Sequence, residues 1–191
     1  MLKQGCFAVL IMLGIMCLSA CVGSLWTGAS MVYDRHNVYK KLDDYRLFVK
    51  VNDAIAVDKL FKENNTVIDI AVFNGDILIA GHVPTMEMLA ELRQRLHKVS
   101  GYRRLFNAVT FSTSPSNNLQ DSWITTKIRS QIFADGSIDP NAFKIVTSDG
   151  VVYLMGDVHQ DEADKVINSA RHTVGVVRVV KILKYYTYQN K

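Results

Sequence analysis

The sequence predicts an α+β fold made of two tandem copies of a helix–strand–strand–helix–strand unit. In residues 43–112 and again in residues 121–188, hydrophobic spacing changes from helical to strand-like in the same order. Each copy also contains a hairpin signal between two apolar runs, Asn74-Gly75 in the first and Asp149-Gly150 in the second. Similar residues then recur at equivalent positions of the two copies, which indicates an internal duplication.

In the first copy, Leu47, Val51 and Ile55 recur at every fourth position and predict an amphipathic helix with an acidic start. Residues 66–73 and 76–83 predict the two strands of the hairpin. Thr85 is expected to cap a second helix, which Gly101 ends. Residues 102–111 then predict a third strand, so that each copy has two helices on one face of a three-stranded sheet.

In the second copy, Ile124, Ile128 and Ile132 form the stripe of the first helix behind Asp121. Residues 143–148 and 151–158 predict the hairpin strands, and residues 176–186 the last strand, after a second helix that begins with acidic residues. The matching pairs between the copies are Lys50 with Lys127, Val51 with Ile128, Ile55 with Ile132, Gly75 with Gly150, Gly81 with Gly156, Val83 with Val158, Gly101 with Gly175, and Arg104 with Arg178.

The first-copy strands are apolar on both faces, because Ile77 and Leu78 are adjacent and point to opposite sides of a strand. One sheet face should bind the helices, so something must cover the other face. The second copy is one interpretation, and a partner protein is the other.

The N-terminus has the three parts of a secretory signal: Lys3, an apolar run over residues 7–18, and small residues before a cysteine. Leu18-Ser19-Ala20-Cys21 resembles the lipobox of bacterial lipoproteins, which predicts a signal peptide at 1–20 and lipidation of Cys21. The alternative is an ordinary signal with an incidental cysteine. Val22 is not the aspartate associated with inner-membrane retention, so we expect an outer-membrane protein facing the periplasm.

The composition excludes several function classes. Without residues 1–20 the chain has 21 basic and 18 acidic residues, too small an excess for a general nucleic-acid binder. The histidines show no paired metal spacing, and Pro140 stands where a calcium loop through Asp135, Ser137 and Asp139 would need glycine. No nucleophile–base arrangement is evident. We therefore expect no enzymatic activity, no metal and no cofactor.

The lipobox and the two repeats resemble the dual BON-domain outer-membrane lipoproteins of the DolP type. The residues that carry the resemblance are DSWITTKIRSQ from Asp121 and GVVYLMG from Gly150. It extends over residues 44–186 and is weaker in the first copy, where Arg46 stands in place of Trp123 and Ala80 in place of Met155. The resemblance implies a lipid-anchored protein, without enzymatic activity, that binds anionic phospholipid and supports envelope integrity.

The residues themselves indicate a membrane-binding surface on the first helix of the second copy. At about 100° per residue, Trp123 lies on the polar face with Thr126, Lys127 and Ser130, and Arg129 is nearby. A large aromatic ring beside a cation suits the headgroup region of a membrane. Two alternatives remain: Trp123 could pack on the linker or the first copy, and a solvated helix face would equally explain Lys127 and Arg129.

Two further basic groups are weaker candidates. One surrounds the end of the second helix of the first copy, where the helix dipole alone favours cations. It consists of Arg93, Arg95, His97, Lys98, Arg103 and Arg104. The other group is C-terminal. The alternative for this group is that its charges lie on an edge strand and keep that strand from pairing with another chain. Its members are Lys181, Lys184, Tyr185, Tyr186 and Tyr188.

The expected organisation is a signal peptide at 1–20, a lipidated N-terminus and tether at 21–42, a first BON domain at 43–112, a linker at 113–120 and a second BON domain at 121–188. Binding of anionic phospholipid through the second domain is the preferred function. The alternative is an adaptor that binds an envelope protein through the first domain, by way of its apolar second sheet face.

Overall fold

The computed structural model describes residues 35–56, 59–62 and 65–186. Residues 37–191 form one compact unit. The expected signal peptide, Cys21 and most of the tether lie outside the described residues. The first helix, α2, runs over Arg35–Ala56. It therefore begins inside the segment expected to be a tether, because the largely exposed residues before Leu47 continue the helix.

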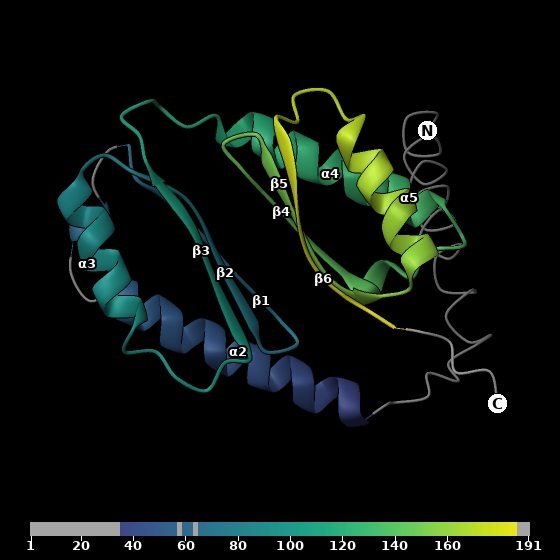
Figure 1. Cartoon of the computed structure of the whole chain (residues 1–191), viewed down its shortest axis with the longest axis horizontal. Coiled ribbons are helices and arrows are strands. Elements are labelled where there is room, and N and C mark those ends of the chain that lie inside the picture. Colours follow the sequence, from purple (N-terminus) through teal and green to yellow (C-terminus); the bar gives the residue numbers. More distant parts are fainter. Residues whose placement is uncertain (1–34, 57–58, 63–64, 187–191) are drawn as a thin grey trace, which may run out of the picture. The chain divides into compact units, whose positions relative to one another are not determined.

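Each repeat has the expected order of elements (Figure 1). The first repeat consists of α2, β1 (Val67–Phe73), β2 (Asp76–Val83), α3 (Met86–Leu96) and β3 (Arg104–Phe111). The second consists of α4 (Asn118–Ala134), β4 (Phe143–Ser148), β5 (Val151–Val158), α5 (Gln160–Arg171) and β6 (Arg178–Tyr185). Short 3-10 helices, η1 (Leu60–Lys62) and η2 (Pro140–Ala142), precede β1 and β4. The α+β fold class is confirmed.

The two sheets have the same topology. In the first, the order is β1-β2-β3, with β1 antiparallel and β3 parallel to the central β2. In the second, β4 and β6 flank β5 in the same way. The expected hairpin turns are present, and Asn74, Gly75, Asp149 and Gly150 all have positive φ. Thr85 caps α3 as predicted, accepting a hydrogen bond from the backbone of Met88 at 3.2 Å.

A glycine in each central strand allows the neighbouring strand to approach closely. Gly81 in β2 has a φ of +118°, and a Cβ built on it would lie 2.1 Å from the carbonyl oxygen of Val67. At the equivalent position of β5, a Cβ on Gly156 would lie 2.7 Å from the carbonyl oxygen of Ala142. Neither position leaves room for a side chain.

Each sheet packs against its own two helices on one face (Figure 1). The opposite faces of the two sheets share a third apolar cluster, whose buried members are Ala71, Leu78, Ala80, Tyr153, Met155 and Ile182. The second repeat therefore covers the apolar second face of the first. This decides the question left open by the sequence, and an adaptor function through that sheet face is excluded because the face is buried.

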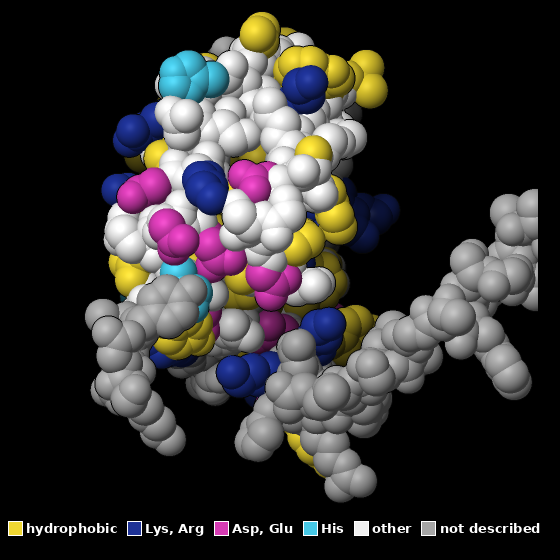
Figure 2. Space-filling view, turned by 90° about the vertical axis from the view of Figure 1, so that its right-hand side faces the viewer, with side chains coloured by type: hydrophobic (Ala, Val, Ile, Leu, Met, Phe, Trp, Pro, Cys, Tyr) yellow, Lys and Arg dark blue, Asp and Glu magenta, His cyan; other side chains and the backbone are white. Residues whose placement is uncertain are grey.

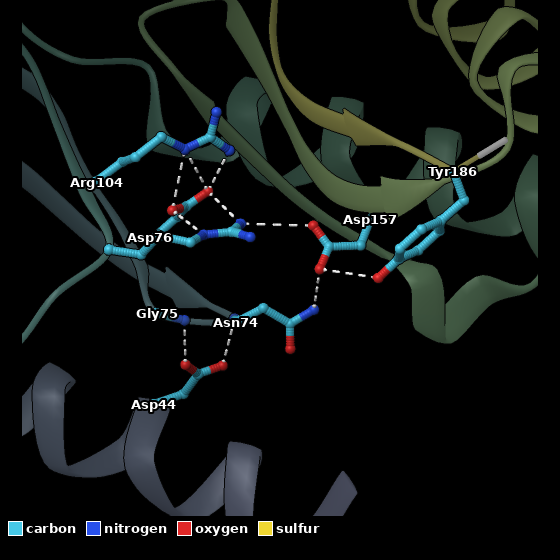
Figure 3. Close-up of polar contacts among 8 residues, drawn as sticks. Asp44, Asn74, Gly75, Asp76, Arg104, Asp157 and Tyr186 are labelled. Atoms are coloured by element: carbon cyan, nitrogen blue, oxygen red, sulfur yellow. Dashed lines mark hydrogen bonds and ion pairs between the residues drawn. The ribbon is translucent and has the colours of Figure 1, made fainter. Parts of the chain in front are cut away.

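An aspartate in the first helix of each repeat binds the hairpin turn of the same repeat, and Figure 3 shows this contact for Asp44 of the first repeat. The carboxylate of Asp44 accepts hydrogen bonds from the backbone of Asn74 at 2.7 Å and Gly75 at 2.8 Å. In the second repeat, Asp121 accepts from the backbone of Asp149 at 2.8 Å and Gly150 at 2.9 Å. Asp121 was expected at the start of α4, but Asn117 is the N-cap. The helix thus begins within the expected linker.

A buried carboxylate at the start of β2 holds two arginines (Figure 3). Asp76 accepts hydrogen bonds from Arg103 at 2.7 and 2.8 Å and from the Nε of Arg104 at 3.0 Å. Burial would raise the pKa of Asp76, but the hydrogen bonds and charges of the two guanidinium groups outweigh it and hold this pKa below its ordinary value. Arg103 also lies 3.5 Å from Asp157 of the second repeat.

Equivalent positions of the two repeats contact each other in both directions. The side chain of Asn74, in the first hairpin turn, donates a 3.0 Å hydrogen bond to Asp157, just after Gly156. In the second hairpin turn, the carboxylate of Asp149 lies 2.8 Å from Nδ1 of His82, just after Gly81. Each turn therefore binds the end of the central strand of the other repeat.

Asp69 is a partly buried carboxylate at the boundary between the repeats. Its Oδ2 accepts a 2.6 Å hydrogen bond from Ser148. Burial raises the pKa of Asp69, and the negative charges of Asp121 and Asp149 raise it further, although the Ser148 hydrogen bond acts in the opposite direction. The folded state therefore holds this proton more tightly than the unfolded chain, and the group loses stabilising effect as pH rises through its folded pKa.

Asp69→Asn is accordingly expected to increase the free energy of unfolding at about pH 7, because the amide oxygen can still accept from Ser148 and the buried charge is gone. The gain should be smaller at about pH 4, where the carboxyl is more often protonated in both states. Urea unfolding at both pH values would measure this. Asp53→Asn, at an exposed position of α2, is the control. A decrease in stability at pH 7 would contradict the assignment.

Candidate functional site

Helix α4 is fixed to the second repeat by its apolar stripe. Ile124, Ile128 and Ile132 are buried in the core between the helices and the sheet. On the same side, the hydroxyl of Thr125 donates a 2.7 Å hydrogen bond to that of Thr147 in β4. These contacts determine which face of α4 points outward.

The outward face of α4 carries large apolar side chains. At about 100° per residue, Leu119, Trp123 and Phe133 lie within about 80° of one another, opposite the isoleucine stripe. Their side chains are 85%, 51% and 72% exposed. Between them on the same face lie Thr126 and Ser130, both exposed. Burying these three side chains elsewhere would be favourable by about 1.5–3 kcal/mol each if it were complete.

Two cations flank this apolar face. Lys127 and Arg129 are exposed and lie about 80° to either side of it on the helix. Neither forms an ion pair within residues 35–56, 59–62 and 65–186. A long apolar face between two unpaired cations can rest on an apolar layer bordered by anions, because the cations reach the anionic groups on either side.

All five residues of the sequence-predicted site are therefore on the exposed surface of one helix. Trp123 is half exposed, whereas the alternative that it packs on the linker or the first repeat would require it to be buried. The sequence interpretation missed Leu119, because this residue falls in the linker expected at 113–120. It also missed Phe133, because this residue is distant in the sequence from the cluster around Trp123. Their spacing from Trp123, four residues before it and ten after it, places both on the same helical face and could have identified them.

Several members of the two weaker basic groups are engaged within the protein. Arg103 and Arg104 bind Asp76, and Arg95 donates a 2.7 Å hydrogen bond to Glu91 and one to the carbonyl of Ile55. At the C-terminal strand, the ammonium of Lys184 lies 5.6 Å from the centre of the Tyr186 ring. These contacts make both groups poorer candidates for an anionic ligand than α4.

The described residues offer little support for other chemistry. No cluster of three or more His, Cys, Asp or Glu side chains among them could bind a metal ion. Asp135, Ser137 and Asp139 lie in the loop between α4 and β4, where Ser137 binds the carboxylate of Asp135. None of the described helices combines the length and apolar character needed to span a membrane.

Comparison with known proteins gives a family and two curated relatives. The BON-domain family model matches residues 120–185. Outer membrane lipoprotein DolP of Haemophilus influenzae is 29% identical over 171 residues, covering 88% of this chain and 88% of that protein. A 21 kDa hemolysin of Actinobacillus pleuropneumoniae is 28% identical over 154 residues, 80% of this chain and 79% of that protein.

Among solved structures, the C-terminal domain of CdsD, a structural protein of the type III secretion system of Chlamydia trachomatis, is 18% identical. The match covers 75% of this chain and 67% of that one, with a TM-score of 0.30. The matched family segment, by contrast, extends over α4 to β6, the whole second repeat with the exposed helix. Residues 120–185 of this chain therefore form a BON domain.

Proposed function

We propose that this protein is a non-enzymatic lipoprotein, anchored through Cys21 in the outer membrane and facing the periplasm, that binds anionic phospholipid through α4 and supports envelope integrity. The observation that carries the proposal is the outward face of α4, where Leu119, Trp123 and Phe133 are exposed between Lys127 and Arg129. The similarity to a protein named as an outer membrane lipoprotein supports the location.

The physical argument combines two weak attractions. The Trp123 ring can enter the headgroup layer, where an aromatic ring with a polar N–H is favourable. Each cation near an anionic membrane surface adds about 1 kcal/mol. The anchor holds this site close to lipid and raises its effective concentration, so a modest intrinsic affinity suffices. The charge contribution should fall as salt is added.

The first test is sedimentation of unlipidated residues 22–191, which retain the whole compact unit, with anionic or zwitterionic vesicles. We expect selective binding to anionic vesicles. Trp123→Ala should weaken it about tenfold, because half of a large apolar side chain is lost from the contact. Lys127→Ala should weaken it about fivefold and reduce its salt dependence. Tyr45→Ala, at an exposed aromatic of α2, is the control and should bind like wild type.

Three outcomes would contradict the proposal in different ways. Equal binding to both vesicle types would exclude recognition of anionic headgroups. Selective binding that survives both α4 substitutions would move the site to another surface. Absence of binding to either vesicle would exclude the lipid function and favour the adaptor.

An adaptor that binds an envelope protein through the first repeat is the second candidate. Because the sheet face is covered, it would need another surface, and an open groove beside α2 is available. The groove has a volume of about 490 Å³ and is lined by Tyr45, Phe48, Phe73, Lys144 and Tyr186, among others. The side chains of Tyr45 and Phe48 are exposed there. In contrast to lipid binding, such docking would not require anionic headgroups.

A further inference from the structure

The loop between α5 and β6 exposes two valines, although hydrogen bonds fix the loop at both of its ends. Val174 and Val177 are each 79% exposed. At one end of the loop, Thr173 is buried and its hydroxyl donates a 2.9 Å hydrogen bond to the carbonyl of Ser169. At the other end, the backbone N–H of Val177 donates a 2.9 Å hydrogen bond to the carbonyl of Gly150. Packing in the core of the protein therefore does not explain why these two exposed side chains are apolar.

This loop lies against the beginning of α4 (Figure 1). A Cβ built on Gly175 would lie 2.6 Å from the side-chain nitrogen of Gln120 and 3.3 Å from the end of the Ile124 side chain. Gly175 also has a φ of +88°, which fixes the loop in a conformation that side-chain-bearing residues rarely adopt. Val174 and Val177 thus lie beside the end of α4 that carries Leu119 and Trp123.

Contacts along α4 and α5 show that the two helices run in opposite directions. From one end to the other, the backbone N–H of Asp139 binds Glu162, the Ser137 hydroxyl accepts from Lys165, and the Ser169 hydroxyl donates to Gln131. The beginning of α5 is therefore beside the segment that follows α4, and the end of α5 is beside the last part of α4. The loop after α5 continues in the same direction and reaches the beginning of α4 at Gln120.

The two ends of this helix pair differ in charge. The end formed by the last part of α4 and the beginning of α5 is predominantly acidic, because Asp135, Asp139, Asp161, Glu162 and Asp164 outnumber Lys165 there. At the other end, Arg171 and His172 are exposed immediately before the valine loop, and Lys127 is exposed at the middle of α4. Figure 2 shows hydrophobic side chains with His and Lys or Arg toward the top of one face, and Asp and Glu gathered across its middle.

We infer that the α5–β6 loop is a second membrane-contacting element, and that Val174 and Val177 enter an anionic bilayer together with Leu119 and Trp123. This inference rests on the proposed function and adds an orientation to it. An anionic surface attracts the basic end of the helix pair and repels the acidic end. The beginning of α4 therefore lies deeper in the membrane than Phe133 at its far end.

A single fluorescent label reports the position of the loop directly. The only cysteines are Cys6, Cys17 and Cys21, so residues 22–191 contain none and one can be introduced. A label on Val174→Cys should be quenched by nitroxide-bearing lipid in anionic vesicles. A label on Ala90→Cys, exposed on α3 of the first repeat, should remain unquenched. Sedimentation of both labelled proteins shows that each is bound.

A substitution that preserves shape tests the contribution of the loop to affinity. Val174→Thr together with Val177→Thr replaces two exposed methyl groups by hydroxyls and should weaken binding to anionic vesicles about five- to tenfold. Phe133→Ser, at the acidic end, should have a smaller effect than this double variant. Circular dichroism should show both variants folded, since the substituted positions are exposed.

The outcomes separate this inference from the proposed function. A bound protein with an unquenched label at 174, or a double variant that binds like wild type, would overturn the inference and leave binding through α4 intact. If Phe133→Ser weakens binding more than the double variant, the proposed tilt is wrong. If the wild type binds neither anionic nor zwitterionic vesicles, the proposed function and this inference both fail, and a protein becomes the expected occupant of the valine loop.

Discussion

Gly81→Ala is expected to lower the free energy of unfolding by roughly 2–6 kcal/mol, enough to remove much of the stability of a domain of this size. A methyl group at this position would lie 2.1 Å from the carbonyl oxygen and 2.8 Å from the carbonyl carbon of Val67. Because both are backbone atoms of the paired strand, the clash can be relieved only by moving β1 away from β2. Overpacking of this kind costs about 1–3 kcal/mol, and a φ of +118° adds about 1–3 kcal/mol for an alanine.

Urea unfolding followed by circular dichroism would measure this loss, with Gly136→Ala as the matched control. Gly136 lies in the α4–β4 loop, where a Cβ would have no heavy atom within 4 Å. The control should change stability by less than about 0.5 kcal/mol, as most exposed substitutions do. If Gly81→Ala unfolds at the same urea concentration as wild type, the close approach of the two strands is not a feature of the protein in solution.

Asp76→Asn should lower the free energy of unfolding by about 3 kcal/mol, toward the lower end of the range for breaking a buried ion pair. The side chain of Asp76 is only 3% exposed, so the asparagine cannot recover the lost interactions from water. The two arginines are about a third exposed and can turn partly to solvent, which limits the loss. Thermal or urea unfolding at neutral pH is the measurement.

The loss should also depend on pH in a defined direction. Because the pKa of Asp76 is lowered in the folded protein, its stabilising effect is present above the unfolded pKa of about 3.9 and disappears as pH falls through the lower folded value. The difference between wild type and Asp76→Asn should therefore shrink below about pH 4. A difference that grows in acid would contradict the ion-pair assignment.

The second repeat provides a further comparison for Asp76. By the register of the two sheets, Val151 stands at the position of Asp76, and Val177 stands at that of Arg103. The second repeat therefore has no carboxylate at this position. Asp76→Val with Arg103→Val would copy this arrangement and should be more stable than Asp76→Val alone, because it does not leave that arginine without its partner.

Local patterns in the sequence were sufficient to predict the repeated elements. The Asn74-Gly75 and Asp149-Gly150 turns and the Thr85 cap depend on residues close together in the chain, and all are present. The starts of α2 and α4 were placed too late because their first turns are polar and carry no apolar stripe. The role of Asp44 and Asp121 in binding the turns depends on contacts about 30 residues away, which no local pattern encodes.

In the candidate site too, some features follow from local patterns in the sequence, whereas others depend on packing between distant parts of the chain. Helical periodicity was enough to place Trp123 and Lys127 on an outward face of α4. The proximity of Val174 and Val177 to that helix could not be predicted, because it depends on how the loop after α5 packs beside Gln120. The sequence predicted that something covers the first sheet but left the second repeat and a partner protein as alternatives, since a buried strand face does not identify what buries it.

The reciprocal contacts between the repeats have the character of an isologous interface. The turn of each half binds the strand end of the other, through Asn74 and Asp157 in one direction and Asp149 and His82 in the other. A chain whose halves meet in this way resembles a homodimer joined into a single polypeptide. Because each half already supplies the partner for the sheet of the other, the outer helices of one half can diverge without loss of assembly. In this chain, the first helix of the second half exposes Trp123, whereas the first helix of the other half has Arg46 at that position.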